Sequence, residues 1–137
     1  MILFHSESDF VIHKKSLYKK WIKNCVVYLA KEVGNINYIF CNDDYLLTIN
    51  KKYLNHDTYT DIISFDYSEK DKLSGDIYIS VDRLKENAGK FKTSFEDELN
   101  RILIHGILHF AGFNDKSKAE KIEMRKQEDY LISLLDF

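Results

Sequence analysis

The stretch DIISFDYSEKDKLSGDIYIS, residues 61–80, has the sequence pattern of two β-strands. It contains two segments rich in β-branched and aromatic side chains, residues 61–67 and 76–80, with a polar turn over residues 68–75 between them. Two such segments joined by a polar turn that contains glycine are typical of a β-hairpin. We therefore predict that the two segments pair as neighbouring strands.

Toward the amino terminus, extended and helical patterns alternate. Residues 35–41 alternate apolar and polar side chains, which predicts a strand, and a second short strand is expected at residues 2–5. Between these strands, apolar residues recur at the spacing of an amphipathic helix, and Gly34 stands where such a helix would end. The apolar positions of this helix are Ile22, Val26, Leu29 and Val33.

Helical patterns also flank the hairpin. Asn42 is a favourable N-cap for a helix that continues to Tyr53, and residues 55–59 form a polar loop after it. Beyond the hairpin, the pattern is helical from Val81 onward. The last two helices each begin with a capping box, in which Ser or Thr precedes Glu by three residues. One runs from Thr93 and Glu96 to Gly112, and the other runs from Ser117 and Glu120 toward Leu135.

This order of elements indicates an α+β fold in which helices cover a small mixed β-sheet. The chain has 137 residues, of which 45% are hydrophobic, so we expect one domain that spans residues 1–137. This hydrophobic content excludes intrinsic disorder, and no apolar run approaches the ~20 residues of a membrane-spanning helix. Because the first residues lack a basic segment followed by an apolar one, we expect no signal peptide, no membrane partner and a cytoplasmic location.

The net charge of -2 argues against a nucleic-acid binder with a broad basic surface. Cys25 and Cys41 lie in apolar segments and are predicted to be buried thiols in a reducing compartment. Two segments rich in cations are interpreted as solvated helix faces, while a local basic patch stays an open alternative. The first contains Lys14, Lys15, Lys19, Lys20 and Lys23, and the second contains Lys116, Lys118, Lys121, Arg125 and Lys126.

The segment HGILHFAGFND, residues 105–115, carries the strongest chemical signal. His105 and His109 are four residues apart on a helix near the C-terminus, so both imidazoles project from one face within reach of one ion. Gly112 ends the helix and turns the chain, and Asp115 follows three residues later. Two neutral imidazoles and one carboxylate make three metal ligands and leave a fourth tetrahedral position for water, which is typical of a catalytic zinc site.

A pair of histidines at this spacing also arises by chance, and the alternative is a plain α+β domain with buried histidines. The apolar flanks favour the metal, because burying two imidazoles without partners costs on the order of 1–3 kcal/mol each. Zinc proteases carry their general base at the position of Gly106, so peptide hydrolysis is disfavoured. Gly106 is expected to leave room beside the metal for a bulky substrate or a neighbouring backbone. Glu98, two helical turns before His105, either supports the metal site or is a solvated carboxylate.

Three segments together form a family pattern. The first is His-Gly-x-Leu-His-x-x-Gly at residues 105–112, the second is Tyr53 followed by Asp57 and residues 60–65, and the third is Gly-Asp-Ile at residues 75–77. Along the chain these motifs occur in the order that the family shows, and the chain resembles the YbeY family of metal-dependent endoribonucleases, which act in ribosomal RNA maturation. The resemblance implies an α+β fold, a zinc ion, RNA as the substrate and a cytoplasmic location.

Two departures from the family pattern concern the site. Asp115 stands where the family has its third histidine, and Asn114 replaces the aspartate before it. Because a carboxylate is a sound zinc ligand, we interpret Asp115 as a replacement ligand, and its harder oxygen also suits Mn²⁺ or Fe²⁺. Leu54 stands where the family has an arginine that faces the substrate, so a cation for the phosphate must come from elsewhere or activity is reduced. His56 in the same loop is a candidate substrate contact.

The resemblance thus implies a single-strand-specific endoribonuclease that acts on ribosomal RNA and the small ribosomal subunit, without a dinucleotide cofactor. One zinc ion is expected between His105, His109 and Asp115, and metal-activated water would hydrolyse the phosphodiester. The main alternative is a non-catalytic ribosome-assembly or RNA-binding factor in which the metal is structural. Leu54 favours this alternative, whereas the free coordination position opposes it.

Overall fold

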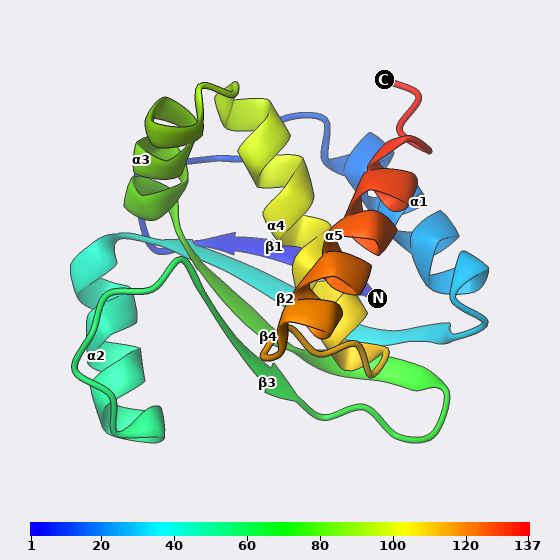
Figure 1. Ribbon diagram of the computed structural model, residues 1–137, viewed down its shortest axis with the longest axis horizontal. Helices are drawn as coiled ribbons and strands as arrows, with labels where there is room; N and C mark the ends of the chain where they lie inside the picture. The colour runs from blue at the N-terminus through cyan, green and yellow to red at the C-terminus, as the bar shows by residue number, and fades with distance from the viewer.

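A four-stranded sheet in the order β1-β2-β4-β3 forms the centre of the computed structural model, which describes residues 1–137 (Figure 1). β2 pairs in parallel with both β1 and β4, and β3 pairs antiparallel with β4. The sheet is therefore mixed, and the helices packed on it make the fold α+β, as the sequence predicts. The strands are β1 (Ile2–Ser6), β2 (Glu32–Cys41), β3 (Ile62–Asp66) and β4 (Lys72–Ser80), and the helices are α1 (Lys15–Tyr28), α2 (Asp43–Leu54), α3 (Val81–Phe91), α4 (Phe95–Phe110) and α5 (Lys118–Ile132).

The two faces of the sheet are covered unequally. One face packs against α1, α3, α4 and α5 in a core of 24 buried residues, and α4 lies across the strands (Figure 1). On the other face, α2 covers a small cluster of Cys41, Leu46 and Ile63. Side chains alternate along a strand, so in β4 Ile77 belongs to the large core while Tyr78 packs against the small cluster. None of the helices has the length and hydrophobicity that crossing a membrane requires.

Close packing fixes α4 against the sheet at two glycines. Gly106 of α4 is buried, and a Cβ there would lie only 2.8 Å from Cδ1 of Ile77. Likewise, a Cβ at Gly75 of β4 would collide with the carbonyl oxygen of Phe65 and with the ring of Phe110. The prediction that Gly106 leaves room for a substrate or a neighbouring backbone is wrong, because the side chain of Ile77 occupies that space.

The boundary between α1 and β2 differs from the prediction. α1 ends at Tyr28, where Ala30 adopts a positive φ of 60° and the Lys31 amide donates to the Val26 carbonyl at 3.1 Å. Val33 and Gly34 therefore lie in β2 and do not extend or end the helix. Gly34 has a different role, because any Cβ at this position would collide with the Ser74 side chain of β4.

The turn of the predicted hairpin and one predicted cap also differ from the prediction. β4 begins at Lys72, so residues 72–75 of the predicted turn are strand, since pairing with β2 uses their backbone and Leu73 is buried in the core. The N-cap of α4 is Ser94, whose hydroxyl accepts a hydrogen bond from the Asp97 amide at 3.1 Å. Thr93 is not a cap because its amide closes α3 by donating to the Ala88 carbonyl at 3.0 Å. The predicted caps at Asn42 and at Ser117 with Glu120 are confirmed, and α5 ends at Ile132, before Leu135.

Candidate metal centre

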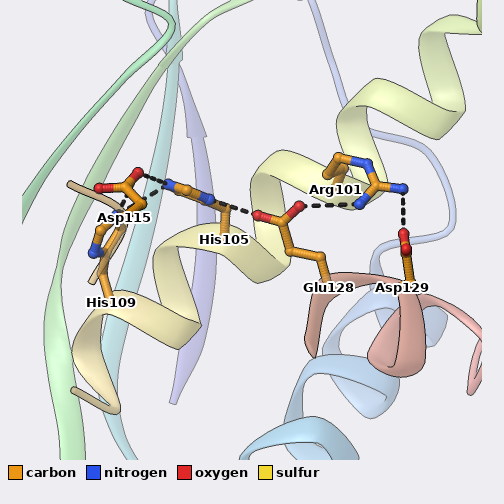
Figure 2. Close-up of polar contacts among 6 residues, drawn as sticks. All are labelled: Arg101, His105, His109, Asp115, Glu128 and Asp129. Carbon is orange, nitrogen blue, oxygen red and sulfur yellow. Dashed lines mark hydrogen bonds and ion pairs between the residues drawn. The ribbon is translucent and has the colours of Figure 1, made fainter. Parts of the chain in front are cut away.

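α4 presents its two histidines beside the edge strand β3. His105 and His109 lie one turn apart, and their side chains are 18% and 28% exposed. Just beyond the helix end at Phe110, Gly112 adopts a φ of 101°, which a residue with a Cβ rarely adopts. This turn brings Asp115 back to the two histidines (Figure 2).

Three ligand atoms converge on one point. His105 Nε2 lies 2.9 Å from His109 Nε2 and 3.2 Å from Asp115 Oδ2, and His109 Nε2 lies 3.5 Å from the same oxygen. Ligands bound to a tetrahedral zinc ion at about 2.0–2.1 Å lie about 3.3 Å from one another. The three atoms therefore match the spacing that one ion requires. The structure brings together all three residues that the sequence nominates as ligands.

A row of charged side chains restrains His105 at Nδ1, the ring nitrogen that does not face the other two ligands (Figure 2). His105 Nδ1 donates to Glu128 Oε2 at 2.6 Å, and Arg101 donates to the other oxygen of Glu128 at 3.0 Å. Arg101 also donates to Asp129 at 2.8 Å. With Nδ1 engaged as a donor, the lone pair of Nε2 points toward His109 and Asp115, which is the tautomer that a metal ion needs.

Glu128 is the functional residue that sequence reasoning misses. Its side chain is only 6% exposed, although it belongs to a helix with many solvated charges. The sequence does contain a pattern that indicates burial of Glu128, because Met124, Glu128 and Leu131 recur at helical spacing and share the buried face of α5. A carboxylate on a buried face requires a partner, and here the partners are His105 and Arg101.

The charges around His105 raise its pKa. Burial alone lowers the pKa of this imidazole, but the hydrogen bond to Glu128 and the negative charges of Glu128, Asp115 and Asp61 outweigh burial. Asp61, just before β3, has its pKa raised by burial, and the charge of His105 opposes this shift in part. His105 is thus held in a strongly anionic environment that also suits a divalent cation.

The other predicted site residues form no hydrogen bond or ion pair with the three ligands. Glu98 accepts a hydrogen bond from the Thr93 hydroxyl at 3.0 Å, so the carboxylate that supports His105 is Glu128 and not Glu98. His56 is exposed in the loop after α2, and its side chain forms no hydrogen bond or ion pair with the ligands. Leu54 is the last residue of α2 and is 42% exposed.

The two cysteines take no part in this site. Both thiols are free and buried, and burial raises the pKa of each to about 12. A thiol with so high a pKa is neither a nucleophile nor a metal ligand near neutral pH. The sequence prediction of buried thiols at Cys25 and Cys41 is confirmed.

Comparisons with known proteins identify the family of this chain. The family model described as endoribonuclease YbeY matches residues 3–136. The endoribonuclease YbeY of Flavobacterium psychrophilum is 52% identical over 134 residues, covering 98% of this chain and 96% of the relative. That of Bacteroides thetaiotaomicron is 46% identical over 121 residues, covering 88% of each chain.

The fold has a counterpart among solved structures. The solution structure of a Thermotoga maritima protein matches with a TM-score of 0.67 and 28% identity over 97% of this chain and 90% of that one. Identity of about one half over nearly the whole chain, together with the family match, decides the classification. This chain belongs to the YbeY family of endoribonucleases.

Proposed function

We propose that this protein is a metal-dependent endoribonuclease that hydrolyses phosphodiesters of single-stranded RNA during ribosomal RNA maturation. The observation that carries this proposal is the convergence of His105, His109 and Asp115, with Glu128 orienting His105. Family membership supplies the RNA substrate class. The small ribosomal subunit is the proposed partner, and the cytoplasm is the proposed location.

His105, His109 and Asp115 are the residues that would hold the ion, and zinc is the metal we propose. When bound, the metal polarises a phosphoryl oxygen and lowers the pKa of a water molecule toward neutrality. The protein holds its own ligands in place, because α4 is packed on the sheet and Glu128 restrains the His105 ring. The oxygen ligand of Asp115 also suits Mn²⁺ or Fe²⁺.

The test compares RNA cleavage and metal content in the wild-type protein, Asp115→Ala and the control Asp71→Ala. Asp71 is a surface carboxylate with 74% of its side chain exposed. We expect about one metal ion per wild-type chain, and we expect Asp115→Ala to lose metal and at least about 100-fold in cleavage rate. Asp71→Ala should behave as wild type. Cleavage that survives both Asp115→Ala and thorough chelation would refute the metal-dependent mechanism.

A second candidate function is a non-catalytic RNA-binding factor for ribosome assembly, with the metal in a structural role. The observation that favours it is Leu54, which stands where the family carries a substrate-facing arginine. Cleavage of a single-stranded RNA by wild-type protein and its loss in His109→Ala would exclude this candidate. Wild-type protein that binds RNA without cleaving it under any metal would favour it.

A further inference from the structure

A pocket of about 240 Å³ is lined by His105, one of the three candidate metal ligands. His105 lines it together with side chains from α3, α4, α5 and the chain just before β3. Two cations, Arg101 and Arg125, and three carboxylates, Asp61, Glu98 and Glu128, face this pocket. Whether it can accept an anion therefore depends on which of these charges are already engaged.

Most of the charged groups in this pocket have partners. Glu128 bonds to His105 and Arg101, and Arg101 is shared between Glu128 and Asp129. Glu98 accepts the hydrogen bond from Thr93 described above. Arg125 has no ion pair and no hydrogen bond, and its side chain is exposed, so its guanidinium is the unpaired cation of the pocket.

The position of Arg125 on α5 ties it to the metal centre. It precedes Glu128 by three residues, which places the two Cβ atoms about 5–6 Å apart on one helix face. Glu128 contacts His105 at 2.6 Å, and buried Met124 anchors the same turn of the helix in the core. Arg125 therefore belongs to a helical turn that is anchored in the core, and it lines the same pocket as His105.

We propose that Arg125 forms a phosphate-binding subsite, which holds the RNA phosphate next to the one at the metal centre. A guanidinium presents a planar fork of donors that binds phosphate oxygens bidentately, and no ion pair engages that of Arg125, although Asp61, Glu98 and Glu128 line the same pocket. The inference rests on the proposed function, because that function brings a sugar–phosphate chain to the metal centre. It adds a substrate-binding residue on α5, a helix to which the sequence motifs assign no substrate contact.

The test measures how metal-free protein binds a short fluorescein-labelled single-stranded RNA, using fluorescence anisotropy at several salt concentrations. The variants are Arg125→Gln, Arg125→Lys and the control Lys126→Gln, whose exposed side chain does not line the pocket. We expect Arg125→Gln to bind about 10-fold more weakly, with a slope of log K against log salt that is shallower by about 0.7. Arg125→Lys should keep the slope but recover only part of the affinity.

Equal binding by Arg125→Gln and Lys126→Gln would overturn the subsite, as would the absence of RNA binding by the wild-type protein. Cleavage by metal-loaded protein separates this inference from the proposed function. Cleavage with a KM that rises in Arg125→Gln while kcat holds supports both. Binding that depends on Arg125 without any cleavage upholds the subsite and refutes the nuclease. Cleavage with a KM indifferent to Arg125 upholds the nuclease and refutes the subsite.

Discussion

Glu128 decides how strongly protons compete with a metal ion for His105. Its charge raises the pKa of His105, and a protonated imidazole has no lone pair to donate. As the pH falls through this raised pKa, His105 takes up a proton and metal affinity declines. In Glu128→Gln the raising charge is gone, so the pH at which metal affinity declines should move lower.

The same substitution should weaken metal binding by about 10- to 100-fold at high pH, where His105 is neutral in both proteins, because the restraint on the ring is lost. Zinc affinity measured against pH with a competing chelator reports both effects. Glu123→Gln is the matched control, since Glu123 lies on the same helix and bonds only to Gln127 at 3.0 Å. An unchanged pH midpoint in Glu128→Gln would contradict this role.

At the scale of elements, the contact between α4 and β4 at Gly106 offers a direct test. In Gly106→Ala, a gain in helix propensity of about 1 kcal/mol opposes an overpacking cost of about 1–3 kcal/mol against buried Ile77. We expect a net loss of up to about 2 kcal/mol in the free energy of unfolding, measured by urea denaturation.

The companion variant Ile77→Val removes the Cδ1 atom that a Cβ at residue 106 would meet at 2.8 Å. The double variant should therefore be more stable than the sum of the two single effects predicts. Strictly additive effects would show that this close approach does not control how α4 sits on the sheet.

The sequence predicts most elements because their signals are local. The hairpin, the cap at Asn42 and the capping box of α5 each depend on residues within a few positions of one another, and each is confirmed. The predicted end of α1 is wrong because the spacing of Val33 fits a helix. In the structure, Val33 pairs with Leu73 of β4 and therefore lies in a strand. No local pattern reports a partner so distant along the chain.

The contrast between local patterns and partners distant in the sequence also explains which residues of the candidate metal site could be predicted. His105 and His109 share one helix and Asp115 follows its terminal turn, so a short motif predicts that they meet. Glu128 comes from the next helix, and its hydrogen bond to His105 depends on how α5 packs against α4. Glu98 has the right spacing on α4, but its side chain bonds to Thr93 instead.

At the level of the whole molecule, none of the three candidate metal ligands belongs to the hydrophobic core, so we expect the chain to fold without the ion. The core of 24 buried residues joins four helices to the sheet, and all buried side-chain polar atoms have hydrogen-bond partners within the protein. We expect chelation to leave the far-UV circular dichroism unchanged. Stability should fall by about 3–4 kcal/mol if the metal is present at 100 to 1,000 times its Kd.

Thermal unfolding followed by circular dichroism, with and without a chelator, checks this expectation. Readdition of zinc should restore the melting temperature. A chelated protein that loses its helical signal at room temperature would instead indicate a structural metal, and that result would favour the assembly-factor alternative.

The parallel pairing of β2 with β4 has a consequence for the time course of folding. Residues such as Tyr38 and Ile77 pair across a loop closure that spans α2 and β3, whereas β3 and β4 are close in sequence and can pair locally. Refolding followed by the fluorescence of buried Trp21 should therefore occupy milliseconds to seconds. Because the chain has no proline, we expect no additional phase of tens of seconds. We therefore expect pairing of β2 with β4 to set the rate at which the candidate metal ligands come together.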